Sequence, residues 1–494
     1  MRHRFPRFRL LAAAAVAPLL LAGGCVHQAP RVYGSPGVST RPDRPWTPPA
    51  GLAQATPEAA APDIPEALKK AGEDLTLLDI VDVALRSSPQ TAEAWAQARS
   101  AAAAYGSEKG AYYPQLDATA NVARAQGTIA NGRIAFFQRS YGPGADLSWL
   151  LFDFGGRGAA VDETRQALVA ADFTHNAVIQ GVILDVEKAY FTYVATKALL
   201  EAQEATLKEA RANLDAAEER HKAGLATIAD VLQAKTSMAQ AQLALDGLQG
   251  QVETTRGALA TAMGLPANTP YDVGVPKVEM PVDRTFEAVE GYLAKAQRLR
   301  PDLAAARAEA EKAGSHLKKV KAEGYPSLTG AAAVGRTYFD SRNLYGNTYS
   351  AGIYLKVPLF TGFSHQYNVM KAAADEDAAR ARLKGLEQRV VFEVWSSYHD
   401  LKTSRQRVLT SEDLFRSASE SHDVALGRYK AGVGSILDLL AAQGQLADAR
   451  AQRVQAYADW YASLAQLAHD TGTLSVDDPV KELVAPVAVE EKKP

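Results

Sequence analysis

One stretch of this chain occurs twice. The segment from Arg220 to Ala234, RHKAGLATIADVLQA, returns from Arg428 to Ala442 as RYKAGVGSILDLLAA. The two copies align without a gap, and we call the difference in residue number between Arg220 and Arg428 the repeat offset. A repeat with so long a period indicates equivalent structural units that pack against each other. The chain is therefore expected to fold as two similar halves.

Each copy of the repeat predicts a tight turn between two helices. Gly224 and Gly432 stand just after the predicted end of the first helix, where a left-handed residue is needed. A Thr or Ser then caps the second helix. Asp230 or Asp438 follows three residues later, as in a capping box with Asp in place of Glu.

A pair of strands is predicted upstream of each hairpin. Tyr113-Pro114 and Tyr325-Pro326 open these segments, and their separation is four residues longer than the repeat offset. The predicted strands are 115–124, 141–152, 328–338 and 349–360, joined by loops at 127–132 and 340–347. Ten-residue strands with two-residue alternation and aromatic ends are typical of membrane barrels, although a soluble sheet covered by helices alternates in the same way. Four strands cannot enclose an aqueous lumen, so a membrane-spanning reading requires an oligomer.

Two long helices follow the strand pairs. Residues 158–222 and 364–430 contain no Pro, and each segment would extend about 100 Å as a helix. Return helices are predicted at 227–263 and 435–468. The predicted fold class is mainly α with membrane β and a two-fold internal repeat.

The start of the chain is expected to be a lipoprotein leader. Four Arg residues within the first nine positions precede a short apolar run at 10–21. Small residues then lead to Cys25, the single Cys of the sequence. By resemblance to bacterial lipoproteins, Cys25 is predicted to be acylated and to anchor the chain in outer-membrane lipid. No later stretch offers 18 consecutive apolar residues, so passage through a membrane is expected to use strands.

These features divide the chain into six parts. We expect a signal peptide at 1–24, a Pro/Ala-rich tether at 25–72, a first repeat at 73–270, a linker at 271–284, a second repeat at 285–474 and a disordered tail at 475–494.

Several kinds of chemistry find no support in the sequence. Lys plus Arg (54) and Asp plus Glu (56) nearly balance, which argues against nucleic-acid binding. The nine His residues are scattered, and no metal, nucleotide or nucleophile motif is present. We therefore expect no cofactor, no metal site and no enzymatic activity.

Taken together and in this order, the duplicated features resemble the TolC-type outer-membrane efflux family, especially its lipid-anchored, OprM-like branch. The resemblance rests on the Tyr-Pro strand entries, the Leu-Phe strand exits, the long helices, the two hairpins and Cys25. It implies a homotrimer in which four strands per chain form a 12-stranded barrel, continued by an α-helical coiled-coil barrel across the periplasm. It also implies a passive exit duct served by a periplasmic adaptor and an inner-membrane transporter. Drugs, metal ions, small metabolites and polypeptides all remain open as cargo.

Within this resemblance the two hairpins become the periplasmic tip. The residues matching the family's periplasmic gate are Asp230, Asp438, Tyr429 and Arg428, and the turn residues expected to dock the adaptor are Gly224, Leu225, Gly432, Val433 and Gly434. A simpler alternative is that both Asp residues only complement their helix N-termini. Many relatives read Leu-Asp-Ala-Gln where this chain has Ala441 in place of Asp, and some carry a basic residue at the position of Gly434.

Two other classes of protein compete with the channel. A non-channel periplasmic coiled-coil lipoprotein, acting as spacer or adaptor, would also have a lipidated N-terminus and a helical hairpin. An adaptor is expected to have one hairpin and a compact β domain, whereas this chain repeats the strand–strand–long-helix order. An enzyme on a helical scaffold would need a site that the sequence lacks.

Overall fold

The computed structural model describes residues 41–44, 75–129, 134–274, 288–339 and 344–475. The predicted leader and Cys25 lie outside these residues, as do most of the predicted tether and tail.

Two runs of six main elements follow each other in the same order. The first run is α3 (Leu77–Ser87), α4 (Pro89–Lys109), β1 (Gln115–Ile129), β2 (Ile134–Phe152), α5 (Gly156–Lys222) and α6 (Ile228–Ala262), with a short 3-10 turn, η2 (Gly110–Tyr112), before β1. The second run is α7 (Val289–Leu299), α8 (Pro301–Ala322), β3 (Ser327–Phe339), β4 (Leu344–Lys356), α9 (Ser364–Lys430) and α10 (Ile436–Asp470). The repeat seen in the sequence is therefore a repeat of structure.

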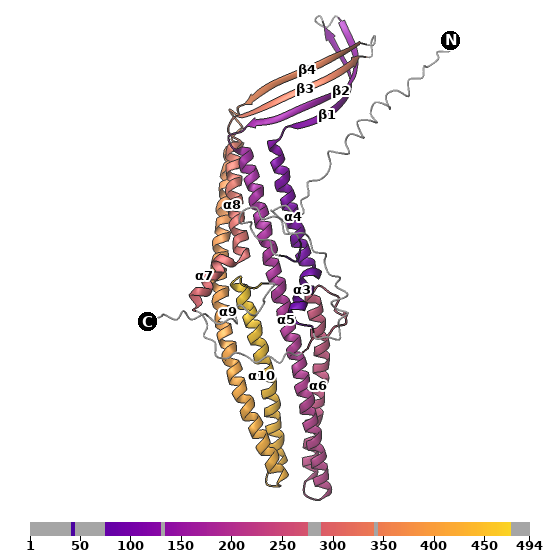
Figure 1. The fold of residues 1–494 in the computed structure, drawn as a ribbon, viewed down its shortest axis with the longest axis vertical. Coiled ribbons are helices and arrows are strands. Elements are labelled where there is room, and N and C mark those ends of the chain that lie inside the picture. The colour runs from indigo at the N-terminus through magenta and orange to yellow at the C-terminus, as the bar shows by residue number, and fades with distance from the viewer. Residues whose placement is uncertain (1–40, 45–74, 130–133, 275–287, 340–343, 476–494) are drawn as a thin grey trace, which may run out of the picture.

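The described chain is a long rod with the strands at one end and the hairpin turns at the other (Figure 1). Helices α5 and α9 each contain 67 residues, as the absence of Pro predicted, and each runs about 100 Å. They carry the chain from the sheet to the hairpin tips, and α6 and α10 return along them.

The strands form one antiparallel sheet in the order β1-β2-β3-β4. The strand ends differ from the predictions. The ladder of β1 with β2 continues to the pair Ile129–Ile134, so the predicted loop at 127–132 begins too early. Similarly, β4 already begins at Leu344, inside the predicted loop at 340–347. It ends at Lys356 instead of residue 360, because Pro358 has no N–H to continue the ladder.

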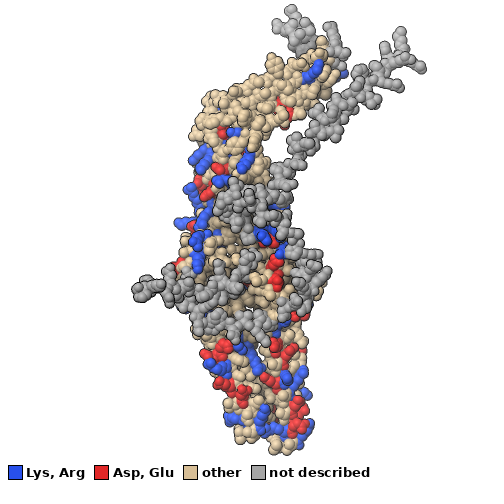
Figure 2. Space-filling view, in the orientation of Figure 1, with Lys and Arg blue, Asp and Glu red and all other residues tan. Residues whose placement is uncertain are grey.

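The two faces of the sheet differ in chemistry. One row across the four strands reads Leu116, Leu147, Ala332 and Ala351, and these residues lie opposite each other in the register. The next row, on the opposite face, reads Asp117, Asp146, Ala333 and Ser350. On the face shown in Figure 2 the sheet end carries few charged side chains, while Lys, Arg, Asp and Glu gather along the helices. Such alternation is typical of strands with one side in lipid and one in water.

The main core lies midway along the rod. Ile80 and Leu85 of α3 pack with Ile183 of α5 and with Leu259 and Met263 around the end of α6. A capping box formed by Thr76 and Asp79 fixes the start of α3.

Segments expected to be tether and linker also contact this region. The Pro42 carbonyl oxygen lies 2.7 Å from Nε2 of His175, and Asp43 lies 3.9 Å from Arg86. Tyr271, at the start of the predicted linker, is buried in the core.

One described helix, α5, is long and apolar enough to cross a membrane by length and composition, although the sequence predicts no membrane-spanning helix after the leader. Its most apolar window of 18 residues has a mean hydropathy of 1.4 and is 44% buried within the chain. Ile179, Val182 and Val186 of this helix belong to the main core. This burial favours a core helix over a membrane span.

Two carboxyl groups of α5 are buried without a partner. Asp172 and Glu187 are both 0% exposed, and none of their carboxyl oxygens has a hydrogen-bond partner in the described part of the chain. Burial raises the pKa of Asp172 to about 8 and that of Glu187 to about 8. Each group is therefore protonated in the folded chain at neutral pH.

Replacing both residues, Asp172→Asn with Glu187→Gln, should stabilise the fold increasingly from pH 5 to pH 8. Below about pH 4 both carboxyls are protonated, folded or unfolded. Between about pH 4 and 8 only the unfolded chain ionises them, so wild-type stability falls as pH rises. At pH 8 the gain should be roughly 1–3 kcal/mol.

Thermal unfolding of the two proteins across this pH range measures the effect. Asp215→Asn, an exposed position on the same helix, is the control and should be neutral. A pH-independent difference between the double variant and wild type would contradict the assignment.

Candidate functional site

The two hairpin turns have the same hydrogen-bonded geometry. Gly224 (φ 71°) and Gly432 (φ 76°) are left-handed, as predicted. The N–H of Gly224 donates to the carbonyl of His221 (2.9 Å), and that of Leu225 donates to the carbonyl of Arg220 (2.8 Å). The turn of the second hairpin contains the two equivalent hydrogen bonds. This is the Schellman arrangement, which stops a helix sharply and allows the chain to reverse.

Both predicted capping boxes are present. A carboxylate oxygen of Asp230 accepts from the N–H of Thr227 at 2.8 Å, and the Asp230 N–H donates to the Thr227 hydroxyl at 3.3 Å. At the second turn the corresponding distances between Asp438 and Ser435 are 3.4 and 3.1 Å. Asp438 is exposed and Asp230 is half-buried, so each carboxylate caps its helix and keeps contact with solvent.

A residue that the sequence reasoning overlooked joins the two hairpins. Arg220 of α5 stacks on the ring of Tyr429, with its guanidinium carbon 4.7 Å from the ring centroid. Its Nη1 donates to the Tyr429 carbonyl at 2.6 Å. Arg428, predicted like Tyr429 to be a gate residue, is exposed, and in the described part of the chain no hydrogen bond or ion pair involves its guanidinium. The repeat in the sequence could have identified Arg220, because it aligns this residue with the predicted gate residue Arg428.

Tyr429 is held in a buried position by these contacts. Its side chain is 6% exposed and packs with Ile436 and Leu439. Burial raises the pKa of Tyr429, and the nearby Asp230 carboxylate adds to the rise, while Arg220 opposes it. The phenol of Tyr429 is therefore neutral at physiological pH. Arg220 contacts the face of the Tyr429 ring and the Tyr429 backbone carbonyl.

Three further polar contacts join α5 to α10 above the tip. The Asn213 amide donates to Oε1 of Gln443 at 2.8 Å, and both side chains are buried. Gln443 also donates to the Thr206 carbonyl at 3.4 Å. Arg450 of α10 forms an ion pair with Glu209 of α5 at 3.0 Å. The buried Asn213 and Gln443 and the partly buried ion pair fix the position of α10 against α5.

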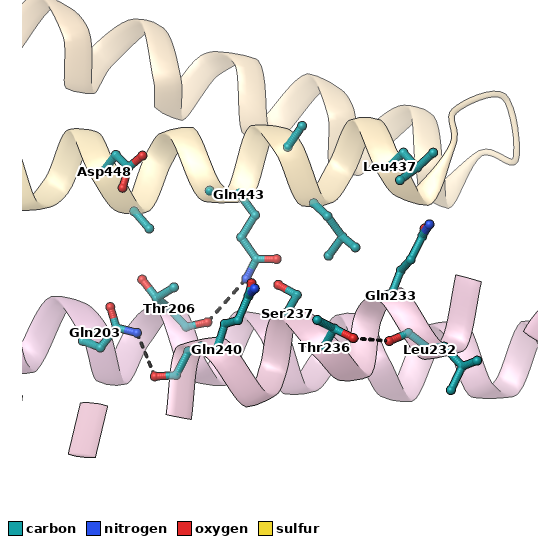
Figure 3. Close-up of a pocket in the computed structure, with 15 residues that line it drawn as sticks. Gln203, Thr206, Leu232, Gln233, Thr236, Ser237, Gln240, Leu437, Gln443 and Asp448 are labelled. Atoms are coloured by element: carbon teal, nitrogen blue, oxygen red, sulfur yellow. Dashed lines mark hydrogen bonds between the residues drawn. The ribbon is translucent and has the colours of Figure 1, made fainter. Parts of the chain in front are cut away.

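A polar groove lies between α6 and α10 beside these contacts (Figure 3). Its volume is about 740 Å³. Gln233, Thr236 and Gln240 of α6 line one side, and Gln443 of α10 reaches across it toward Thr206. Ala441 also lines this groove.

The predicted docking residues are at the outermost end of the rod. Leu225 is 72% exposed and Val433 is 70% exposed. Ile228 and Leu437, which the sequence reasoning did not single out, are also exposed beside them. Gly434 packs differently, because a side chain there would come within 3.0 Å of the Arg428 Cβ. A larger residue at position 434 would therefore displace Arg428.

Among the residues that the structure describes, no group of three or more His, Cys, Asp or Glu side chains is placed to hold a metal ion.

Comparison with known proteins agrees with this architecture. The sequence matches the family described as outer membrane efflux protein over residues 80–265 and 292–473. It is 28% identical over 453 residues to protein CyaE of Bordetella pertussis, covering 88% of this chain and 92% of that protein. It is 28% identical over 419 residues to outer membrane protein TolC of Vibrio cholerae, covering 81% and 92%.

Solved structures share the fold. The outer membrane protein VceC of Vibrio cholerae superimposes with a TM-score of 0.70 at 23% identity, over 82% of this chain and 98% of that one. A membrane protein from Pseudomonas aeruginosa gives a TM-score of 0.73 at 22% identity, over 86% and 99%.

A duplicated chain with an amphipathic sheet at one end and long helical hairpins at the other, together with the family match, defines a class of outer-membrane efflux channels. The chain belongs to the outer membrane efflux protein family. It is an outer-membrane exit duct, and its family consists of channel and transport proteins.

Proposed function

We propose that three copies of the chain assemble into one continuous conduit, with a 12-stranded barrel in the outer membrane and a helical tunnel in the periplasm. The observation that supports this proposal is the open sheet. In the described structure, β1 and β4 each have a neighbour on one side only. Unpaired strand edges are not tolerated in lipid, and four strands are too few to close around a lumen.

The internal repeat supplies a register for closing the barrel. Within the chain, β2 pairs with β3 so that Leu147 lies opposite Ala332. The Leu-Phe strand exits align β2 with β4 and so Leu147 with Leu355, while the Tyr-Pro strand entries align β3 with β1 and so Ala332 with Ala120. The same pairing between copies then places Leu355 opposite Ala120 of the partner subunit. Both residues lie on the apolar face of the sheet. The same register between copies therefore keeps the apolar side chains on one face and the polar side chains on the other.

The variant Ala120→Cys with Leu355→Cys should therefore form disulfides between copies in oxidised outer membranes. Non-reducing gels should show dimers and trimers in most of the protein. The pair Ala120→Cys with Ile353→Cys shifts the register by two residues on the same face and is the matched control. Monomers for both pairs would contradict the barrel.

We further propose that Cys25 carries acyl chains that anchor the conduit, following a leader at 1–24 and continuing into a tether at 25–72. The tether proposal is supported by residues 41–44, which lie against α3 and α5 in the middle of the rod. An acylated Cys25 would bind the same lipid as the strands.

Replacing Cys25 with Ser should abolish metabolic labelling with palmitate. The variant should still resist carbonate extraction from outer membranes, because the strands span the bilayer independently of the lipid. Cys25→Ala serves as a second variant with the same expectation. Undiminished labelling of either variant would exclude Cys25 as the site of acylation.

The hairpin tip is the proposed periplasmic gate. Three copies bring six carboxylates, from Asp230 and Asp438, around one axis. Close like charges attract cations. Tyr429 contacts Arg220 and holds the hairpins together, while the exposed Arg428 would contact the neighbouring copy.

The variant Asp230→Asn with Asp438→Asn should raise single-channel conductance and weaken block by divalent cations. Asn retains an oxygen that can cap the helix, so only the charge is lost. Thr227→Ala with Ser435→Ala is the reverse control, which removes the caps at about 1 kcal/mol each and keeps the carboxylates.

Unchanged cation block in the Asn variant would assign both carboxylates to capping alone. Arg220→Ala should raise conductance but leave cation block in place, because it loosens the hairpins without removing an acid.

The exposed tip is the proposed site for a periplasmic adaptor, which would connect the conduit to an inner-membrane transporter. Leu225, Ile228, Val433 and Leu437 present an apolar surface that a helical hairpin tip of a partner would cover. The small residues Gly224, Gly432 and Gly434 allow close approach of that partner. Energy and choice of cargo would come from the partners, since the conduit itself contributes no chemistry in this proposal.

A further inference from the structure

A row of aromatic side chains crosses the sheet near the end that lies away from the helices. Val122, Tyr141, Tyr338 and Tyr345 lie opposite each other in the register of the four strands. The rings of Tyr141 and Tyr338 stack with their centroids 5.4 Å apart, and the centroid of Tyr345 is 6.3 Å from that of Tyr338. Side chains alternate between faces along a strand, so this tyrosine row shares the apolar face with Leu147.

The tyrosine row and Trp149 lie at opposite ends of the apolar face. Along β2, Tyr141 is about 26 Å from Trp149 at about 3.3 Å per residue. A strand tilt of about 40° reduces this length to a height of about 20 Å, close to the apolar band of about 25 Å in membrane barrels. Tyr and Trp gather at the two membrane–water interfaces. The tyrosine row therefore lies at the level of the headgroups in the leaflet farther from the helices.

Three arginines surround the tyrosine row on the same face. Arg124 lies directly opposite Arg139, in the next row of this face toward the far end of the sheet. The guanidinium carbon of Arg336 lies 4.1 Å from the ring centroid of Tyr345 and 5.4 Å from that of Tyr338. All three arginines are exposed, and we call them the arginine cluster.

The sheet itself supplies no acidic neighbour to this cluster. In the described strands the carboxylates are those of Asp117 and Asp146, and both lie on the opposite face. Among the few charged side chains that Figure 2 shows on the sheet, Lys and Arg (blue) lie near its far end. Like charges directly opposite each other on two strands repel, as Arg124 and Arg139 do. An anion from outside the strands would offset this repulsion.

The depth of the cluster indicates which anion is available. A lipid-facing Arg is costly at the midplane of the bilayer and costs little at the interface, where headgroup phosphates lie. The planar guanidinium donates two parallel hydrogen bonds to a phosphate, which makes Arg the preferred residue for this contact. An Arg pair beside a third Arg suits a headgroup that carries more than one phosphate.

We propose that the arginine cluster binds the phosphates of lipopolysaccharide, the multiply phosphorylated glycolipid of the outer leaflet. The proposal rests on the barrel in the outer membrane and names a lipid that its outer wall binds. The helices extend into the periplasm, so the far end of the sheet faces this leaflet. One phosphate lies between Arg124 and Arg139, and Arg336, held against Tyr345, contacts another.

The variant Arg124→Gln with Arg139→Gln and Arg336→Gln tests the site in the full chain. Gln keeps a polar side chain and removes the charge. Lipopolysaccharide that remains bound per trimer, after extraction from outer membranes in mild detergent, should fall about tenfold, because charge-assisted hydrogen bonds to phosphate are lost. Mass spectrometry of the intact complex measures the amount.

Lys356→Gln is the matched control. Lys356 is also exposed, but it lies on the opposite face at the helix end of β4, so its loss should leave the bound lipopolysaccharide unchanged. Undiminished lipopolysaccharide on the triple variant would overturn the proposal. An equal loss from the Lys356→Gln protein would overturn it too, because general surface charge would then explain the binding.

Thermal unfolding of the wild-type protein gives a second readout that needs no variant. Lipopolysaccharide added to lipid-depleted trimers in detergent should raise the unfolding temperature more than phosphatidylglycerol, which carries a single phosphate. Equal shifts with the two lipids would contradict recognition of a multiply phosphorylated headgroup.

The barrel cysteines at positions 120 and 355 separate this proposal from the conduit. Introduced into the triple Gln variant, they should still form covalent trimers, which shows that the barrel is intact. Covalent trimers with undiminished lipopolysaccharide would overturn the lipid site and leave the conduit in place. Absence of covalent trimers in the otherwise wild-type chain would overturn the conduit, and the lipid site with it.

Discussion

The backbone of the sheet imposes the strongest constraint on this molecule. A strand in lipid must have both of its edges hydrogen-bonded, and in the described chain β1 and β4 each have one edge free. The rest of the fold allows these free edges to form hydrogen bonds with the strands of further copies of the chain. Two halves with the same order of elements place strands at one end and hairpins at the other, so copies can meet along their whole length.

Local signals in the sequence predicted the ends of the helices well. Thr227 with Asp230 and Ser435 with Asp438 form the expected capping boxes, because each box depends on residues three positions apart. The left-handed Gly224 and Gly432 follow from the same short-range geometry. The ends of the strands were less accessible, since a ladder between β1 and β2 decides whether Gly127 is in a strand or a loop.

Contacts between the halves were beyond a local reading. Arg220 and Tyr429 meet across 209 positions of sequence, and nothing local distinguishes Arg220 from its equivalent Arg428. The burial of Asp172 and Glu187 was equally hidden, because acidic residues on a long helix normally face water. The gate and docking roles of the tip residues stay predictions, whereas their positions at the far end of the rod are observed.

The duplication places equivalent positions of the two halves in different surroundings. Phe191 of α5 stacks on Tyr461 of α10 in the same chain, whereas His399 of α9, one repeat offset later, is exposed. One repeated order of elements therefore yields a helix face that is covered within the chain and an equivalent face that is not. A substitution tolerated in one half need not be tolerated at the equivalent position of the other, because each half is constrained by its own neighbours.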